Sequence, residues 1–212
     1  MTDSPRKRLI WLRGFLQGKG YFQAIEALEL ARKHHKGLRK DNVTPVLDHM
    51  VSIVLFVLGL KIPETVLEDL IDVILLHDIR EDHGVSDEEI RSRFGDTVAD
   101  AVECLTKEFQ GVKKTPEVYF GAIPNNLLAA IGKAGDRFHN QDSMSGVFTL
   151  AKQREQTDET VTYIIPMLKT ARRNFPQFEL LFQSLKTALV SQVKLVEATL
   201  AAAAEATHGV AA

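Results

Sequence analysis

Cysteine is almost absent from this sequence, which has Cys104 alone among 212 residues. A lone cysteine excludes an intrachain disulfide, and the absence of cysteine pairs argues against a structural zinc site. Both points fit a reducing compartment, so we expect a cytoplasmic protein. Cys104 falls in the apolar run of a predicted helix, where a free cysteine is usually a buried packing residue.

Long apolar runs and a surplus of positive charge are also missing. The longest apolar run, Val51 to Leu60, is about half of what a membrane-spanning helix requires. Segment 6–13 begins like a secretory signal, but Arg13 interrupts it and no small-residue cleavage site follows. The formal net charge is −2. We therefore expect no membrane anchor and no long nucleic-acid partner, whereas a few local cations can still hold a small anion.

Apolar residues recur at three- and four-residue spacing, and no clear alternating strand pattern is present. Helix-start signals agree, because Thr44 and Thr115 each precede a proline and Ser86 stands at capping-box spacing from Glu89. The sequence predicts an all-α fold, a compact bundle of about eight to ten helices. The expected helices are 21–35, 45–60, 63–78, 86–94, 96–107, 116–122, 125–140, 155–173, which Pro166 kinks or breaks, and 177–206.

Neither an internal repeat nor a linker-like change of composition divides the chain, so a single domain over residues 1–212 is expected. The polar segment 108–115 is expected to be a plain surface connection, with mobility near a site as the less favoured alternative. Two roles stay open for the last helix, 177–206. It can pack against the core, or it can pair with a second subunit in a homo-oligomer.

Ionisable residues gather where one apolar helix ends. Val73 to Leu76 runs directly into His77 and Asp78, and Glu81 and Asp82 follow. Members of this group that are four residues apart share one face of a helix. Acidic groups at the end of a buried helix are costly unless something compensates them, and a bound cation is the simplest compensation.

Two other segments supply candidate ligands of the same kind. Segment 131–140 is again apolar and then abruptly polar, and it contains Asp136. His49 stands near the start of the apolar helix 45–60. The candidate donors are thus His49, His77, Asp78 and Asp136. Two imidazoles and two carboxylates suit Mn²⁺, Zn²⁺ or Fe²⁺ and leave room for water. Taken alone, Asp136 would more often form an ion pair with Arg137.

Four ordered segments form a recognisable pattern. They are His35–Lys40, His77–Asp82, Phe94–Lys107 and Lys133–Asn140. In order they resemble the H-x-G…R-K, HDxxED, FGxxVA…TK and KxADRxHN segments of the RelA/SpoT-type alarmone hydrolase domain, which is part of the HD superfamily of metal phosphohydrolases. The resemblance covers about residues 20–170, and Gly135 stands where that family usually has alanine.

This resemblance implies an HD-domain helical fold and a nucleotide substrate. The implied reaction is metal-dependent hydrolysis of the 3′-pyrophosphate of guanosine tetra- or pentaphosphate, (p)ppGpp, to GDP or GTP and pyrophosphate. Since the chain leaves no room for a synthetase domain, a stand-alone small alarmone hydrolase is expected. The implied metal is one Mn²⁺ ion on the four donors named above, where it would polarise a phosphoryl oxygen and acidify a bound water. Glu81 and Asp82 would position that water and relay its proton.

The resemblance also assigns substrate contacts. The residues are Arg39, Lys40, Lys133, Arg137, Asn140 and Ser143. Asn140 and Ser143 match positions that touch the sugar and base, whereas Lys133 and Arg137 can equally be solvated helix charges. His35 is expected to orient the loop that holds Arg39 rather than to bind metal.

Two departures from the family pattern lie near the expected base site. Met50 follows His49 where proline is usual, and Val46 stands where an aromatic residue is usual. They leave open the same chemistry on (p)ppApp or on another nucleotide. A non-catalytic nucleotide-binding module on the same fold is the third alternative, and the intact donor set together with Glu81 and Asp82 argues against it.

Overall fold

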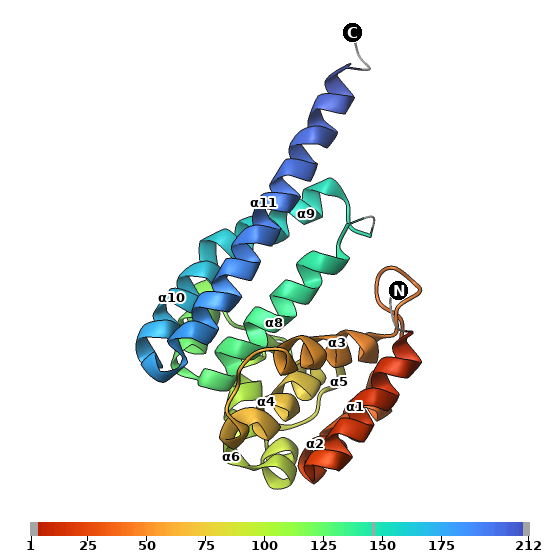
Figure 1. The fold of residues 1–212 in the computed structure, drawn as a ribbon, viewed down its shortest axis with the longest axis vertical. Helices are drawn as coiled ribbons and strands as arrows, with labels where there is room; N and C mark the ends of the chain where they lie inside the picture. Colours follow the sequence, from red (N-terminus) through yellow and green to blue (C-terminus); the bar gives the residue numbers. More distant parts are fainter. Residues whose placement is uncertain (1–3, 146, 210–212) are drawn as a thin grey trace.

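The structure is a computed structural model that describes residues 4–145 and 147–209, with side chains up to residue 203. Gly146 and both ends of the expected domain 1–212 lie outside the described residues. The elements, shown in Figure 1, are α1 (Pro5–Lys19), α2 (Phe22–His34), α3 (Val46–Leu58), α4 (Glu64–Leu76), α5 (Ile79–His83), α6 (Asp87–Leu105), β1 (Glu108–Phe109), β2 (Val112–Lys113), α7 (Pro116–Ala122), η1 (Ile123–Asn125), α8 (Leu127–Ser143), α9 (Leu150–Glu159), η2 (Thr160–Ile164), α10 (Ile165–Asn174), η3 (Pro176–Phe178) and α11 (Glu179–Gly209). The predicted all-α class is confirmed.

Helix α4 lies inside the N-terminal half of the molecule, where it packs against α2, α3, α6 and α8. Every residue from Leu70 to Leu76 is buried. A helix that is covered on all sides must be apolar nearly all round, which accounts for the continuous apolar run before His77. The same packing carries His77, the residue that follows α4, into the interior.

Helix α8 lies against α3, α4, α6 and α11. Asn126 caps its start by accepting a hydrogen bond from the backbone N–H of Ala129 at 3.0 Å. Residues 128–132 and 134–137 are buried, so this helix brings its polar residues into contact with the core. It thereby places Asp136 opposite the end of α4.

The C-terminal part of the chain is helical through Pro166. The proline lacks an N–H and its ring crowds the preceding turn, and the chain meets both demands with a π-helical turn, η2, directly before α10. Helix α11 then packs against α10 and α8 through Phe182, Leu185 and Leu189. In Figure 1 its far end extends beyond the other helices.

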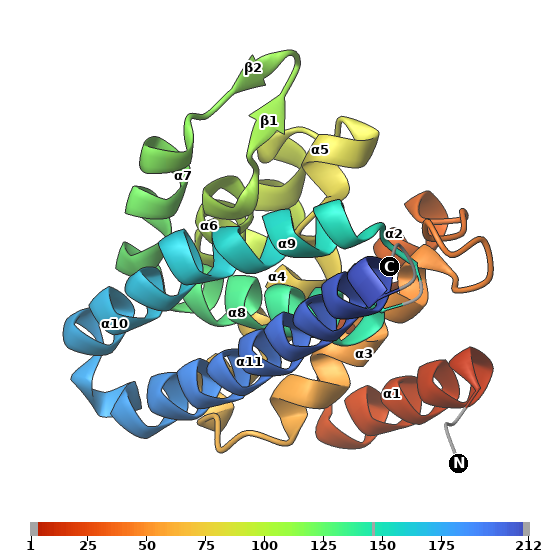
Figure 2. The same ribbon diagram turned by 90° about the horizontal axis from the view of Figure 1, so that it is seen from above.

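Two local features were not predicted. Segment 108–115 holds a small antiparallel hairpin, because Gln110 and Gly111 both have positive φ and turn the chain tightly between β1 and β2. Figure 2 shows this hairpin beside α5 and α7. Helix α1 was not expected, and it buries Leu12 and Leu16 beneath α2 and α3. The helices expected at 86–94 and 96–107 together form α6, and the expected boundary between them is present as the non-helical backbone of Gly95, where φ is 80°.

Within the described ranges, 4–145 and 147–209, none of the helices combines the length and the apolar character needed to cross a membrane.

Candidate active site

Three separate helices bring the predicted metal ligands together. His49 lies in the first turns of α3, His77 and Asp78 join α4 to α5, and Asp136 comes from α8. One donor atom each from His49, His77 and Asp136 lies within 4.8 Å of the other two. All three residues are buried. The structure therefore brings these three predicted donors together.

Asp136 stands between the two imidazoles. Its Oδ1 atom lies 3.2 Å from His49 Nε2 and 4.0 Å from His77 Nε2. The remaining predicted ligand, Asp78, approaches from the other side, with Oδ2 3.1 Å from His77 Nε2. Asp78 thus lies beside His77, at the edge of the cluster that His49, His77 and Asp136 form.

The hydrogen bonds of His77 indicate which of its nitrogens carries a proton. Nδ1 lies 2.7 Å from the backbone oxygen of Ile74, and because a carbonyl only accepts, Nδ1 must be the donor. Nε2 is buried and has no hydrogen-bond partner in the described part of the chain, although Asp78 and Asp136 face it. The lone pair on His77 Nε2 would be repelled by the two negatively charged carboxylates. A positive charge between these groups is therefore needed.

The pKa of His77 points to the same requirement. Burial lowers this pKa, but the negative charges of Asp78 and Asp136 outweigh burial and raise it to about 9. The position therefore favours a cation, and a proton and a metal ion are the two that fit. A divalent ion suits the donor set of imidazole nitrogens and carboxylate oxygens.

His139 and Arg39 orient the second imidazole, that of His49. Arg39 Nη1 donates to His139 Nδ1 at 3.1 Å, so that nitrogen of His139 is an acceptor. It lies 2.8 Å from His49 Nδ1, which must therefore carry the proton. This leaves the lone pair on His49 Nε2, directed at Asp136. Both imidazoles thus present lone pairs to the same carboxylate, which is the arrangement of a metal site.

A cavity of about 460 Å³ opens on one side of this cluster. Its wall includes the predicted residues Arg39, Lys40, Asp82, Asn140 and Ser143, together with His49, Asp78 and Asp136. Phe148, Lys152 and Gln156 also line it, and none of these was predicted. They follow α8, outside the recognised segments, and no local sequence signal marks them. A volume of this size is within the range of small-molecule sites.

A smaller cavity of about 200 Å³ lies on the other side of the cluster. Asp78 and Asp136 line both cavities and so form part of the wall between them. The smaller one is lined by Glu81, Lys107, Tyr119 and Lys133 among others. Lys133 and Glu81 therefore face a different space from Lys40 and Asp82. Lys107 belongs to a recognised segment but had been given no role.

The predicted water-handling pair, Glu81 and Asp82, is divided between these cavities. Glu81 accepts a hydrogen bond from the backbone N–H of Lys107 at 2.9 Å. Partial desolvation at the cavity walls, followed by the negative charge of Asp78, raises the pKa of both carboxyl groups above their ordinary values. Each is thereby better suited to accept a proton than a free carboxylate.

Arg137 lines neither of these two cavities, so its contact with substrate stays a prediction that their geometry does not support. Its guanidinium is buried and forms an ion pair with Glu159, and it also donates to the side chain of Gln156. Arg137 follows Asp136 on α8 and so points about a quarter-turn away from it, toward α9.

The fold and the convergent donors are similar to those of HD-domain proteins. Residues 27–116 match the family model described as HD domain, a range that contains His49, His77 and Asp78. Two of the similar curated proteins agree with the predicted resemblance. One is a guanosine-3′,5′-bis(diphosphate) 3′-pyrophosphohydrolase of Borreliella burgdorferi, 28% identical over 150 residues, which are 66% of this chain and 22% of the relative. A GTP pyrophosphokinase of Streptomyces antibioticus is 27% identical over 173 residues, 74% of this chain and 19% of the relative.

The chain thus spans about a fifth of the length of the curated relatives it matches. One similar solved structure is described as a metazoan ortholog of SpoT that hydrolyses ppGpp. It superposes with a TM-score of 0.63 at 20% identity and covers 82% of this chain and 94% of its own. At that identity the likeness establishes the fold alone, and it agrees with the expected HD-domain architecture.

Proposed function

We propose that this chain is a metal-dependent hydrolase that removes the 3′-pyrophosphate of (p)ppGpp, giving GDP or GTP and pyrophosphate. The observation that carries the proposal is the pair of imidazole lone pairs facing Asp136, in the wall between the two cavities. The relatives include a ppGpp 3′-pyrophosphohydrolase, which supports the choice of substrate.

The larger cavity has the side chains that a nucleoside needs. Lys40 Nζ lies 5.6 Å from the centre of the Phe148 ring, which offers an aromatic face to a base beside a cation for a phosphate. Asn140 and Ser143 supply an amide and a hydroxyl for the sugar and base. Arg39 is engaged by His139 and Asn140, so it positions these two residues in addition to lending its charge.

We place the transferred phosphoryl groups against the shared wall, with the lysines of the smaller cavity close to the pyrophosphate. Lys107 and Lys133 there offset the negative charge of the departing group. Lys133 Nζ is held 3.0 Å from Asp136 Oδ2. This arrangement gives the small cavity a role distinct from that of the large one.

The proposed metal is one Mn²⁺ ion held by His49, His77, Asp78 and Asp136, and when bound it would polarise the phosphoryl oxygens and acidify the attacking water. Glu81 and Asp82 orient this water and take its proton as it attacks the phosphorus attached to the ribose 3′ oxygen. The bond from that phosphorus to the 3′ oxygen breaks, the 3′ oxygen takes up a proton, and pyrophosphate is released. We further propose that the protein acts in the cytoplasm as a single domain.

A second candidate substrate is (p)ppApp, and Val46 is the observation that favours it. Val46 lines the larger cavity at the position where the resembled family has an aromatic residue. Loss of an aromatic contact at the base pocket weakens the preference for a particular base.

The test is to incubate the purified protein with Mn²⁺ and each of ppGpp, ppApp and a 5′-monophosphate, and to separate the products. GDP and pyrophosphate from ppGpp are the expected result. Turnover of ppApp alone would move the function to the adenosine analogue, and no turnover by a metal-loaded sample would leave only a binding module. Asp78→Ala should lose metal and activity together, whereas Glu81→Ala should lose activity and keep the metal. Full activity of Glu81→Ala would contradict the proton-transfer role.

A further inference from the structure

A second group of metal-binding side chains lies beside the active site. His35, Asp82 and His83 each offer one donor atom, and the three atoms lie within 4.8 Å of one another. His35 directly follows α2, whereas Asp82 and His83 end α5, so two elements distant in sequence form the group. We propose that these residues bind a second divalent cation of the zinc type, in addition to the ion of the active-site cluster.

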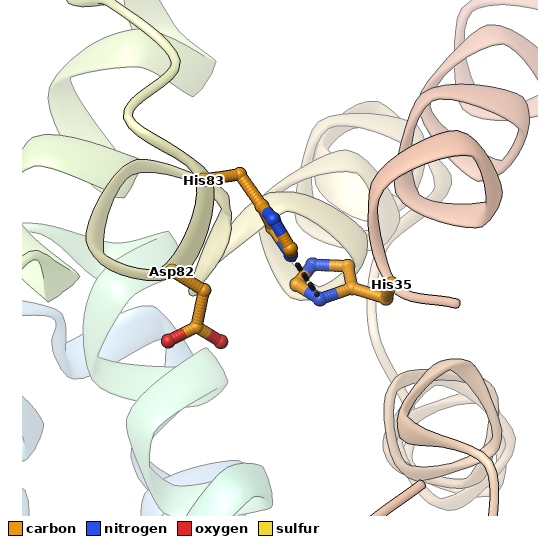
Figure 3. Close-up of side chains that lie close together, drawn as sticks. All are labelled: His35, Asp82 and His83. Carbon is orange, nitrogen blue, oxygen red and sulfur yellow. Dashed lines mark hydrogen bonds between the residues drawn. The ribbon is translucent and has the colours of Figure 1, made fainter. Parts of the chain in front are cut away.

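The two imidazoles are already at the spacing that a shared ion requires. His83 Nε2 lies 3.0 Å from His35 Nδ1, and the ring planes meet at 74°. Figure 3 shows the two rings directed at each other, with the Asp82 carboxylate to one side of them. Two nitrogens on one tetrahedral zinc ion lie about 3.3 Å apart, given Zn–N bonds of about 2.0–2.1 Å. A small opening of the pair would therefore admit the ion.

His35 is prepared to act as a ligand through Nδ1. The residue is buried, and its other ring nitrogen, Nε2, has no hydrogen-bond partner among the residues described. Nδ1 is the ring nitrogen of His35 that faces His83 Nε2, so it is the one available to an ion that the two rings share.

The carboxylate of Asp82 needs a positive partner. Neither a lysine nor an arginine forms an ion pair with it in the part of the chain that the structure describes. Asp78 lies one helical turn before Asp82, whose backbone N–H donates to the Asp78 carbonyl at 2.9 Å, so the two negative side chains repel each other. A cation bound with the two imidazoles would offset this repulsion. Two nitrogens and one carboxylate oxygen form a zinc-type set with a position left for water.

This site has a consequence for activity, and that step rests on the proposed function. Asp82 also lines the larger cavity, where it faces the reaction as a proton acceptor. A cation that engages its carboxylate withdraws it from proton transfer. Zinc in excess of the catalytic ion should therefore slow hydrolysis.

The test counts bound zinc per chain after dialysis of the purified protein against buffered Zn²⁺. We expect two ions for the wild type and one for His83→Ala, whose exposed side chain can be removed without disturbing the core. His34→Ala is the matched control, because this imidazole also neighbours His83, with ring centres 5.2 Å apart, but lies outside the trio. It should keep both ions. An unchanged zinc count in His83→Ala, or an equal loss in His34→Ala, would overturn the site.

The zinc count also distinguishes a failure of the second site from a failure of the proposed active-site metal cluster. If the active-site cluster held no zinc, the wild type would bind one ion and His83→Ala none, which still supports the second site. In the presence of saturating Mn²⁺, the wild type should need at least tenfold less zinc for half-inhibition than His83→Ala. Equal sensitivity of the two proteins would overturn the link between this site and activity.

Discussion

His139 Nδ1 accepts a hydrogen bond from His49 Nδ1 at 2.8 Å. The proton of His49 is thereby held on Nδ1, and the lone pair on Nε2 faces Asp136. Arg39 fixes this direction of the hydrogen bond, because its guanidinium can only donate to His139 Nδ1, which must therefore be an acceptor. Burial, followed by the positive charges of its neighbours, lowers the pKa of His139 to about 3, which keeps it an acceptor at neutral pH. The tautomer of one proposed metal ligand is thus set two residues away from the metal.

Replacing His139 should therefore weaken metal binding without removing a ligand. We expect His139→Ala to lose roughly 10- to 100-fold in Mn²⁺ affinity, the usual cost of losing a residue that orients a metal-bound histidine. His139→Asn is the matched control, because its side-chain carbonyl can accept the same hydrogen bond and should restore most of the affinity. Titration of the apo-protein with Mn²⁺ measures both. Equal affinities of His139→Ala and the wild type would contradict this role.

The sequence could single out the candidate donors because their signal is local. His77 and Asp78 directly follow the apolar helix α4, and Asp136 stands where segment 131–140 changes from apolar to polar, a change that is visible without a fold. The part played by His139 could not be predicted in the same way. It depends on the side chains of Arg39 and His49, which are 100 and 90 positions away in the chain.

Other features have the same cause. The partly buried partner of Arg137, Glu159, lies 22 positions further along and on another helix, so the sequence alone left Arg137 free to face substrate. Phe148 and Lys152 line the cavity from the turn before α9 and from the first turn of α9, where no motif marks them. The spacing of apolar residues was sufficient to predict most of the helices. Contacts between side chains on different helices can be identified only once the fold is known.

Arg137 should matter for stability rather than for substrate binding. Arg137→Ala leaves the partly buried Glu159 with only the longer ion pair to Lys107, at 3.6 Å, so the loss should lie toward the lower end of the about 3–5 kcal/mol that breaking a buried pair costs. Urea unfolding measures this loss. The double variant Arg137→Met with Glu159→Leu should recover much of it, because it removes both charges. Lys40→Ala is the contrasting control: this exposed residue should change stability by less than ~0.5 kcal/mol while raising KM. A KM effect of Arg137→Ala without a stability loss would refute the assignment.

Gly135 departs from the resembled family for a packing reason. A Cβ atom at this position would lie 2.9 Å from Cγ2 of Ile53, a buried β-branched side chain with little freedom to move. We expect Gly135→Ala to destabilise the protein by about 1–3 kcal/mol, as overpacking of a core does. Adding Ile53→Ala should relieve the clash, so the double variant should be more stable than the sum of the two single changes. Additivity of the two changes in urea unfolding would show that the contact is not the cause.

Asp72 gives the protein a pH-dependent stability far from the active site. It is fully buried in α4, Gln23 Nε2 donates to its Oδ2 at 2.7 Å, and Oδ1 has no partner among the described residues. Burial raises the pKa of Asp72 to about 8 despite the Gln23 hydrogen bond. The folded protein therefore retains a proton that the unfolded chain releases near its ordinary pKa of about 3.9.

Stability should accordingly fall as pH rises from about 4 to about 8, by up to ~1.4 kcal/mol per pH unit from this group alone. Asp72→Asn keeps the shape and the acceptor for Gln23 but cannot ionise. At pH 8 it should be more stable than the wild type, and at pH 4 the difference should vanish. Urea midpoints measured across this range for both proteins give the comparison, with Asp69→Asn, a neighbouring acid with more exposure, as the control. Parallel stability curves for Asp72→Asn and the wild type would mean that Asp72 is charged in the folded state.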